Sequence, residues 1–412
     1  MLNTVLMFPG QASQYVGMGK KWYDKYESVR KKFELASDIL NQDMVKLCFE
    51  GPTAQLIKTE NTQVALVTMS TAVFDVAVNE FGIVPSYLAG HSIGEISALT
   101  AAGVFRFEDA VKLAKIRGQA MAECNADGKA GMSAVTRIDA EELMNILKGI
   151  DYQKYSVDVA NFNAPLQTIL SGDNDGMKEI AAVLEAYNAK IVPLSVAGPF
   201  HSRFMAPAKE KLRKALEEIT LGDMKIPVVC GHEGRLYQPG DSIKDLLIEQ
   251  LVSPIRWTEV VGVLEKAGVE RWIEVGPNEV LAKLVKQNVP DAFAYSLDPK
   301  KKAEEEQNEQ VLNPVGLCMG AAVSTRNQNW DDAEYKKGVI EPYKEMEALY
   351  KKLETENRMP TEEELKFSID KLKTIFVTKG VSLKEQAIKY QRILKDVEPA
   401  ELYIKYIEDR IG

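Results

Sequence analysis

The sequence predicts an α/β fold with a mostly parallel β-sheet. From residue 1 to about residue 298, short apolar segments typical of buried strands alternate with segments of helical periodicity. Glycine and proline turns separate many of these segments. After residue 299 the chain becomes rich in lysine and glutamate and mostly helical in pattern. With 412 residues, 45% apolar and 27% charged, it has the composition of a globular protein of more than one domain.

The elements of the sheet can be assigned along the chain. Residues 4–8 form a buried-strand pattern that ends at a Pro-Gly turn, and residues 86–90 form a second one before a helix of small residues. The expected strands are residues 4–8, 86–90, 226–230 and 272–275. The expected helices are residues 61–81, 93–102 and 107–123.

Residues 128–196 have a separate alternation of strand and helix patterns and are expected to form an inserted subdomain. The predicted order is β-α-β-β-α-β, which is that of a ferredoxin-like subdomain. Its expected strands are residues 132–137, 155–160, 168–171 and 190–196, and its expected helices are residues 139–147 and 175–188. The larger domain would therefore consist of residues 1–127 and 197–298.

Residues 299–412 are predicted to be a linker followed by a helical C-terminal extension. The charge run at residues 299–306 is typical of a solvated linker or the start of a helix. Further on, Thr361 and Glu364, and again Ser382 and Glu385, have the spacing of a helical capping box. Both capping-box spacings favour helices.

Charge and composition exclude several function classes. The chain has 51 Lys and Arg against 60 Asp and Glu, a formal net charge of -9, which argues against a dedicated nucleic-acid binder. Its four cysteines and three histidines are scattered, so we predict neither a metal site nor a cofactor. It contains no apolar run of the length of a membrane span and no signal-peptide pattern, so we expect a cytoplasmic protein without a membrane partner.

The strongest local motif is Gly90-His91-Ser92-Ile93-Gly94, between an expected strand and an expected helix. This is G-x-S-x-G in the strand–turn–helix context of a nucleophile elbow, and it predicts an α/β-hydrolase-like domain. The tight turn would raise the Ser92 hydroxyl above the sheet edge, with the Ile93 amide at a helix N-terminus. The structural alternative is a helix N-cap serine between two turn glycines.

A serine nucleophile needs a base, and the residues alone leave two candidates. His201 and His232 each follow an expected strand, where the sites of α/β folds are built. His91 adjoins Ser92, so its side chain is expected to point away. Geometry must decide between the other two histidines.

A set of further motifs occurs in order along residues 1 to about 298. They are FPGQASQ at 8–14, TQ at 62–63, GHSIGE at 90–95, RG at 117–118, NFNAPLQ at 161–167, FHS at 200–202, QLVSPIRW at 250–257 and EVGP at 274–277. On these motifs the sequence resembles the malonyl-CoA:acyl carrier protein transacylases, either of the fatty-acid type or a discrete trans-acting polyketide synthase acyltransferase.

The resemblance implies a catalytic arrangement. Ser92 would be the nucleophile and His201 its general base, oriented by the backbone carbonyl of Gln250. The backbone amides of Gln11 and Ile93 would form the oxyanion hole. The chain would transfer malonyl from malonyl-CoA to the phosphopantetheine thiol of an acyl carrier protein or polyketide synthase module, through a covalent ester.

The resemblance also implies the substrate-binding residues. Arg117 would pair with the malonyl carboxylate, although most arginines of this kind lie on a helix surface. Phe200 would disfavour a methyl-bearing substrate, and Gln63, Asn161 and Gln167 are expected as polar pocket lining. Because carrier proteins are typically acidic, a positive patch is expected near the site, with Arg203 as a candidate.

Three alternatives stay open. An ordinary esterase or lipase shares the serine motif but expects its histidine near the C-terminus. An acyl-thioester hydrolase that clears acyl groups from carrier proteins would use Ser92 and His201 with water as acceptor, and would have no use for Arg117. The third alternative is a binding or docking protein without catalytic activity. A docking role is the leading interpretation only for residues 300–412. The sequence does not distinguish a fatty-acid pathway from a polyketide pathway.

Overall fold

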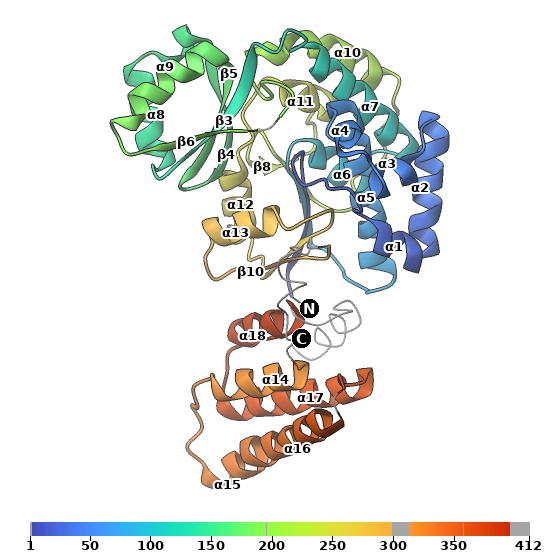
Figure 1. Cartoon of the computed structure of the whole chain (residues 1–412), viewed down its shortest axis with the longest axis vertical. Coiled ribbons are helices and arrows are strands. Elements are labelled where there is room, and N and C mark those ends of the chain that lie inside the picture. The colour runs from blue at the N-terminus through green and yellow to red at the C-terminus, as the bar shows by residue number, and fades with distance from the viewer. Residues whose placement is uncertain (1, 195, 299–312, 357, 396–412) are drawn as a thin grey trace. The chain divides into compact units, whose positions relative to one another are not determined.

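A computed structural model describes residues 2–194, 196–298, 313–356 and 358–395 (Figure 1). Its contacts divide the chain into two compact units. The larger unit contains residues 3–80 and 84–300, and the smaller contains residues 1–2, 81–83 and 301–412. Each unit is considered by itself.

A six-stranded sheet is the centre of the larger unit, in the order β10-β9-β1-β2-β7-β8. Its strands are β1 (Thr4–Phe8), β2 (Tyr87–Gly90), β7 (Val228–Cys230), β8 (Arg235–Leu236), β9 (Arg271–Glu274) and β10 (Phe293–Ser296). All neighbouring pairs are parallel except β7 with β8. In register, Phe8 lies opposite Gly90, and Met7 lies opposite Glu274. The carboxyl ends of β1, β2 and β9 therefore meet at one edge of the sheet.

Helices cover both faces of this sheet. They are α1 (Lys20–Lys25), α2 (Glu27–Leu40), α3 (Met44–Phe49), α4 (Thr53–Leu56), α5 (Thr59–Asn79), α6 (Ile93–Ala101), α7 (Phe107–Glu123), α10 (Ala206–Glu217), α11 (Ile243–Glu249), α12 (Trp257–Lys266) and α13 (Leu281–Asn288). Successive side chains of a strand point to opposite faces. Accordingly, Val5 and Met7 pack with α12 and α13, whereas the Phe8 ring contacts Phe74 of α5.

The helix α5 is buried along most of its length and packs against α6 and α7. A helix that is apolar on all sides belongs in the interior of a protein. Its burial places Gln63 and the facing residue Arg117 of α7 inside the molecule.

A separate four-stranded antiparallel sheet lies within the larger unit, in the order β4-β5-β3-β6. Its elements are β3 (Ala130–Thr136), α8 (Ala140–Gly149), β4 (Val157–Ala164), β5 (Gln167–Asp173), α9 (Asn174–Glu185) and β6 (Lys190–Pro193). The predicted β-α-β-β-α-β order is confirmed. The helices α8 and α9 cover one face of the sheet and enclose a core that includes Leu143, Leu147, Ile180 and Leu184.

Several predicted boundaries in this region were wrong. The strand expected at residues 155–160 runs from Val157 to Ala164, because Asn161, which resembles a turn residue, pairs with Ile169 of β5 and the pairing continues to Ala164 past an irregularity at Asn163. The helix expected to reach residue 188 ends at Glu185, and Asn188 has a left-handed φ of 61°. The last strand ends at Pro193 rather than at residue 196.

The smaller unit is helical. It contains α14 (Pro314–Val323), α15 (Asp332–Tyr335), a π-helical turn at Lys336–Ile340, α16 (Glu341–Glu356), α17 (Glu362–Lys379) and α18 (Leu383–Lys395). The predicted capping box between Thr361 and Glu364 is present at the start of α17. Within the described ranges, no helix is both long and apolar enough to cross a membrane.

Candidate active site

Ser92 occupies a strained position at the carboxyl end of β2. It is the N-cap of α6, with a φ of 54° and a ψ of -116°, which is rare for a residue other than glycine. The two motif glycines are required by packing. A Cβ on Gly90 would lie 2.1 Å from the carbonyl carbon of Gly94, and a Cβ on Gly94 would lie 2.0 Å from the Phe8 oxygen. The motif thus fixes the turn that presents Ser92.

His201 lies next to Ser92, with its Nε2 2.8 Å from the Ser92 Oγ. Its Nδ1 lies 2.8 Å from the backbone oxygen of Gln250, as expected for this residue. Because a carbonyl oxygen only accepts hydrogen bonds, Nδ1 must carry the proton, which leaves Nε2 free to accept from Ser92. Burial and the charge of Arg117 lower the pKa of His201 to about 3, so the imidazole is neutral at neutral pH.

The other two histidines do not contact Ser92. His232 is buried, with its Nδ1 3.4 Å from the Cys230 sulfur. His91 turns away from the serine, and its Nε2 lies 3.0 Å from the Asn163 Oδ1. The geometry therefore favours His201 where the sequence left His201 and His232 open.

Arg117 is also buried beside Ser92, with only 2% of its surface exposed. One guanidinium nitrogen, Nη1, donates to the Gln63 Oε1 at 2.9 Å. The other, Nη2, donates to the Ser92 Oγ at 3.2 Å and to the Gln250 Oε1 at 3.0 Å. Burial lowers the pKa of Arg117 to about 10, which keeps the side chain protonated at neutral pH. A fixed cation is thus held against the serine by two amide side chains.

Gln11 and Ile93 flank the same turn. Gln11 follows β1, and a Cβ on Gly10 would lie only 2.6 Å from the His91 oxygen, so its loop packs directly on the serine turn. Ile93 is the first residue of α6, where a backbone amide has no partner within the helix. Ile93 thus adjoins Ser92, and the loop that carries Gln11 packs on the same turn.

The remaining residues predicted to line the acyl pocket are less directly connected to Ser92. Phe200 is buried and immediately precedes His201. Asn161 is buried and forms a β-bridge with Ile255. The Gln167 Oε1 accepts from the Asn163 side chain at 3.2 Å. Gln167 is thus linked through Asn163 to His91 of the serine motif.

The chain is similar to proteins of known family. Residues 5–314 match the acyl transferase domain family. A malonyl CoA-acyl carrier protein transacylase of Bacillus subtilis is 32% identical over 404 residues, which cover 96% of this chain and 100% of the relative. The chain belongs to the malonyl CoA-acyl carrier protein transacylase family.

Two further members of the family are similar over the larger unit. A transacylase of the same name from Bacillus subtilis strain 168 is 39% identical over 289 residues, 70% of this chain and 90% of that one. A solved malonyl-transacylase, in complex with its type II polyketide synthase acyl-carrier protein, superposes with a TM-score of 0.69. It is 35% identical and covers 72% of this chain and 96% of its own. The 404-residue alignment also shows that the C-terminal region has a counterpart in another family member.

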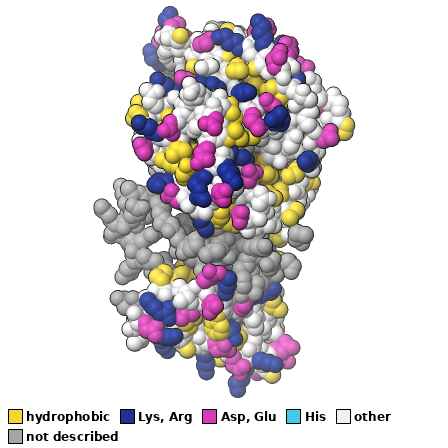
Figure 2. Space-filling model, turned by 90° about the vertical axis from the view of Figure 1, so that its right-hand side faces the viewer, with side chains coloured by type: hydrophobic (Ala, Val, Ile, Leu, Met, Phe, Trp, Pro, Cys, Tyr) yellow, Lys and Arg dark blue, Asp and Glu magenta, His cyan; other side chains and the backbone are white. Residues whose placement is uncertain are grey.

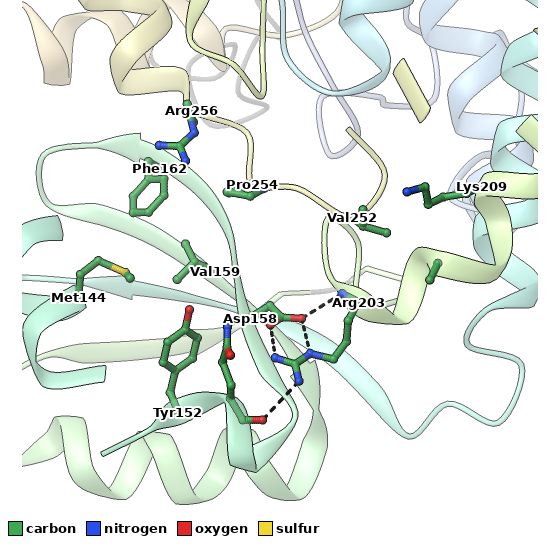
Figure 3. A pocket seen from close by; sticks show the side chains of 12 residues that line it. Met144, Tyr152, Asp158, Val159, Phe162, Arg203, Lys209, Val252, Pro254 and Arg256 are labelled. Carbon is green, nitrogen blue, oxygen red and sulfur yellow. Dashed lines mark hydrogen bonds and ion pairs between the residues drawn. The ribbon is translucent and has the colours of Figure 1, made fainter. Parts of the chain in front are cut away.

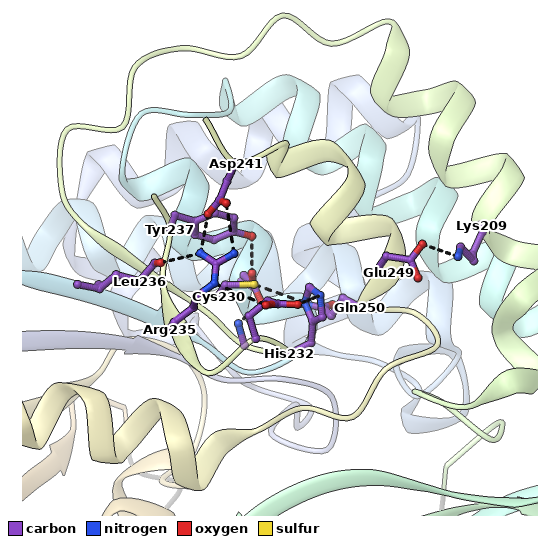
Figure 4. A network of polar contacts seen from close by, with 12 residues as sticks. Lys209, Cys230, His232, Arg235, Leu236, Tyr237, Asp241, Glu249 and Gln250 are labelled. Carbon is purple, nitrogen blue, oxygen red and sulfur yellow. Dashed lines mark hydrogen bonds and ion pairs between the residues drawn. The ribbon is translucent and has the colours of Figure 1, made fainter. Parts of the chain in front are cut away.

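The structure also reveals residues that the sequence analysis did not assign a role. Glu95, in the first turn of α6, is fully buried and contacts the side chains of Tyr237 and Gln250. Figure 4 shows Tyr237, Cys230 and Gln250 within this network of polar contacts. One signal was available in the sequence. Glu95 is a charged residue at the start of a helix of small and apolar side chains.

A groove of about 810 Å³ lies beside β4, and Ser92 does not line it (Figure 3). Its lining residues are Met144, Tyr152, Gln153, Asp158, Val159, Phe162, Arg203, Ala206, Lys209, Val252, Pro254 and Arg256. Arg203, the candidate for a positive patch, is paired with Asp158, whose carboxylate accepts from its Nε at 2.9 Å and from its Nη2 at 2.5 Å. Lys209 is similarly paired with Glu249 at 2.6 Å. The positive patch expected near the site stays a prediction. Figure 2 likewise shows basic and acidic side chains interspersed on one face of the molecule.

No group of at least three His, Cys, Asp or Glu residues suited to a metal ion occurs among the described residues.

Proposed function

We propose that this chain transfers malonyl from malonyl-CoA to the phosphopantetheine thiol of an acyl carrier protein, through a malonyl ester of Ser92, in fatty-acid or polyketide synthesis. The observation that carries the proposal is the position of the Ser92 hydroxyl. It contacts a neutral imidazole, His201, and a buried cation, Arg117, at the same time. The first can remove its proton, and the second can bind a carboxylate.

The first half-reaction is an attack on the thioester. The neutral Nε2 of His201 takes the Ser92 proton as Oγ bonds to the carbonyl carbon. The backbone amides of Gln11 and Ile93 are proposed to stabilise the oxyanion, as in the nucleophile elbow of an α/β-hydrolase-like fold. The imidazolium then returns the proton to the departing CoA sulfur. The strained backbone of Ser92 supports this interpretation.

Arg117 selects the acyl group. A malonyl carboxylate that enters a buried pocket needs a charged partner, since burial of an unpaired carboxylate is strongly unfavourable. The guanidinium fork pairs with a carboxylate through two parallel hydrogen bonds. Gln63 and Gln250 hold that fork in place before the substrate arrives. Phe200, Asn161 and Gln167 are proposed as further lining of the acyl pocket.

The second half-reaction delivers the acyl group to a thiol. His201 would deprotonate the phosphopantetheine thiol, whose sulfur attacks the carbonyl carbon of the Ser92 ester. The bond to Oγ then breaks, and the imidazolium returns the proton to Oγ. The partner class is supported by the solved malonyl-transacylase bound to its acyl-carrier protein. We propose no metal and no resident cofactor. The proposed organisation is a core of residues 1–127 and 197–298, a ferredoxin-like insert at 128–196 and an extension at 299–412.

A hydrolase that clears acyl groups from carrier proteins would use the same serine and histidine. The two functions differ in what resolves the Ser92 ester. The test is to load the protein with malonyl-CoA, remove the excess, and follow the ester by intact-protein mass spectrometry with and without a holo carrier protein. Transfer predicts an ester that persists in buffer and disappears as malonyl-carrier protein forms. Release of free malonate at the same rate in both samples would establish hydrolysis.

A further inference from the structure

Glu95 is a buried carboxylate that is linked to the cation of the site through one intervening side chain. It has no exposed surface. Its Oε1 accepts from the Tyr237 hydroxyl at 2.6 Å, and its Oε2 accepts from the Gly231 amide at 3.0 Å. Its Oε2 also accepts from the Gln250 Nε2 at 2.6 Å. Burial raises the pKa of Glu95, while these donors oppose that shift by favouring the ionised form.

The carboxylate of Glu95 determines which way the Gln250 amide faces. Both Glu95 oxygens accept hydrogen bonds, from Tyr237, Gly231 and Gln250, so the Gln250 amide presents its NH2 end to them. The Oε1 end must then point the other way, where it accepts from the Arg117 Nη2 at 3.0 Å. Arg117 only donates, and a reversed amide would set an NH2 group against the guanidinium. The chain Glu95–Gln250–Arg117 therefore has one compatible arrangement.

The surroundings of Glu95 keep this arrangement rigid. A Cβ on Gly231 would lie 2.8 Å from the Glu95 Oε2, so glycine at this position makes room for the carboxylate. The segment that carries Tyr237 is held by a two-point ion pair between Arg235 and Asp241, at 2.7 and 3.2 Å (Figure 4). Burial and the adjacent Glu95 raise the pKa of Tyr237 well above its usual value, so its hydroxyl remains a donor.

We propose that Glu95 and Tyr237 are positioning residues that fix the Gln250 amide, and through it hold Arg117 in the orientation that selects a carboxylated acyl group. This inference rests on the proposed malonyl transfer and deepens it. Neither residue touches the substrate. Each acts on Arg117 through the side chain of Gln250.

A positioning role of Glu95 and Tyr237 has a consequence that a purely structural role would not have. Without the Tyr237 hydroxyl, the ionised form of Glu95 loses a donor and protonation becomes easier. A protonated Glu95 gains an O–H donor that can compete with Arg117 for the Gln250 Oε1, so the amide and the guanidinium lose their single compatible arrangement. Loading of a carboxylated acyl group should suffer more than loading of an acetyl group, which has no carboxylate to pair with Arg117.

The experiment compares Ser92 acylation by malonyl-CoA and by acetyl-CoA in the full chain, using rapid quench and intact-protein mass spectrometry. The variants are Tyr237→Phe and Glu95→Gln, which delete or exchange a single heavy atom. The matched control is Tyr295→Phe, on β10 at the opposite edge of the sheet from β8. We expect the ratio of the Ser92 acylation rates with malonyl-CoA and with acetyl-CoA to fall about tenfold in Tyr237→Phe, because one hydrogen bond to a charged group is lost. In Glu95→Gln this ratio should fall further. The control should keep the wild-type ratio.

The possible outcomes separate the inference from the proposed function. A wild-type protein that forms no malonyl adduct would refute the proposed function itself. A wild-type adduct with an unchanged ratio in both folded variants would overturn only the positioning role. An equal loss for both acyl groups, or unfolding of both variants in circular dichroism, would assign Glu95 and Tyr237 a stabilising role and also overturn it.

Discussion

The Nη2 of Arg117 donates a hydrogen bond to the Oγ of Ser92 at 3.2 Å. The cation proposed to bind the carboxylate of the substrate thus contacts the nucleophile directly. A cation at this distance favours the negative charge that develops on Oγ as its proton leaves. Once Ser92 carries an acyl group, the hydrogen bond from Nη2 is available to the carboxylate of that group. We therefore expect substrate selection and activation of the serine to be coupled through one side chain.

Removal of either member of the Ser92–His201 pair should prevent acylation. Ser92→Ala should form no adduct with malonyl-CoA, since the acceptor oxygen is gone. His201→Ala should slow adduct formation by about 10²- to 10⁴-fold, the usual contribution of a general base. Intact-protein mass spectrometry during the first turnover measures both. His232→Ala is the matched control, and acylation that depended on His232 instead would contradict the assignment.

The pH dependence of acylation should reflect the low pKa of His201. Burial and Arg117 lower this pKa from 6.5 to about 3, so the base stays neutral across the range in which an ordinary histidine becomes protonated. We expect the acylation rate to remain constant from pH 8 to about pH 5. Stopped-flow or quench kinetics, with circular dichroism to verify folding at each pH, provide the test. A decline centred near pH 6.5 in folded protein would contradict it.

Glu274 should make the folded protein less stable as the pH rises. It is fully buried, and its carboxylate accepts from the Val280 and Ala282 amides at the start of α13. Burial raises its pKa from 4.5 to about 8. Between these two values the unfolded chain loses its proton while the folded chain keeps it, so this group lowers stability as the pH increases through that window. Thermal melting of Glu274→Gln from pH 4.5 to 8 should show a shallower decline than wild type. Parallel curves would exclude the effect.

The close packing of the serine motif predicts a difference between two glycines in helices. Gly94→Ala would place a Cβ 2.0 Å from the Phe8 oxygen, and we expect destabilisation by about 3 kcal/mol or more. Gly262, in the middle of α12, has open space where a Cβ would lie, with no neighbouring atom within 4 Å. Gly262→Ala should stabilise the protein by about 0.5–1 kcal/mol. Urea unfolding measures both changes, and equal effects would show that the steric argument fails.

Much of the architecture could be predicted because local patterns and tertiary structure agree there. The strand at Thr4–Phe8 and the helix at Phe107–Glu123 were placed at their observed boundaries. The serine motif was recognised because its glycines and its position after a strand follow from local geometry. The predicted pairing of His201 with Ser92 and with the Gln250 carbonyl is present in the structure.

The unpredicted features depend on contacts between distant segments. Glu95 and Tyr237 are 142 positions apart, and nothing local in either segment indicates that they meet. The continuation of β4 through Asn161 depends on its bridge to Ile255, which overrides the turn preference of asparagine. The partner of Arg203, Asp158, is 45 positions away in the sequence. Charge pairing of this kind becomes visible only in three dimensions.

The most direct test of the central claim is the relative loading of Ser92 with malonyl and acetyl groups in wild type and in Arg117→Ala. Intact-protein mass spectrometry after brief incubation with each CoA ester, without a carrier protein, gives both adducts. We predict a malonyl adduct on wild type with little acetyl adduct, and a loss of that preference in Arg117→Ala. Equal loading of the two groups on wild type would contradict the role of Arg117 as the carboxylate partner, and with it the proposed specificity.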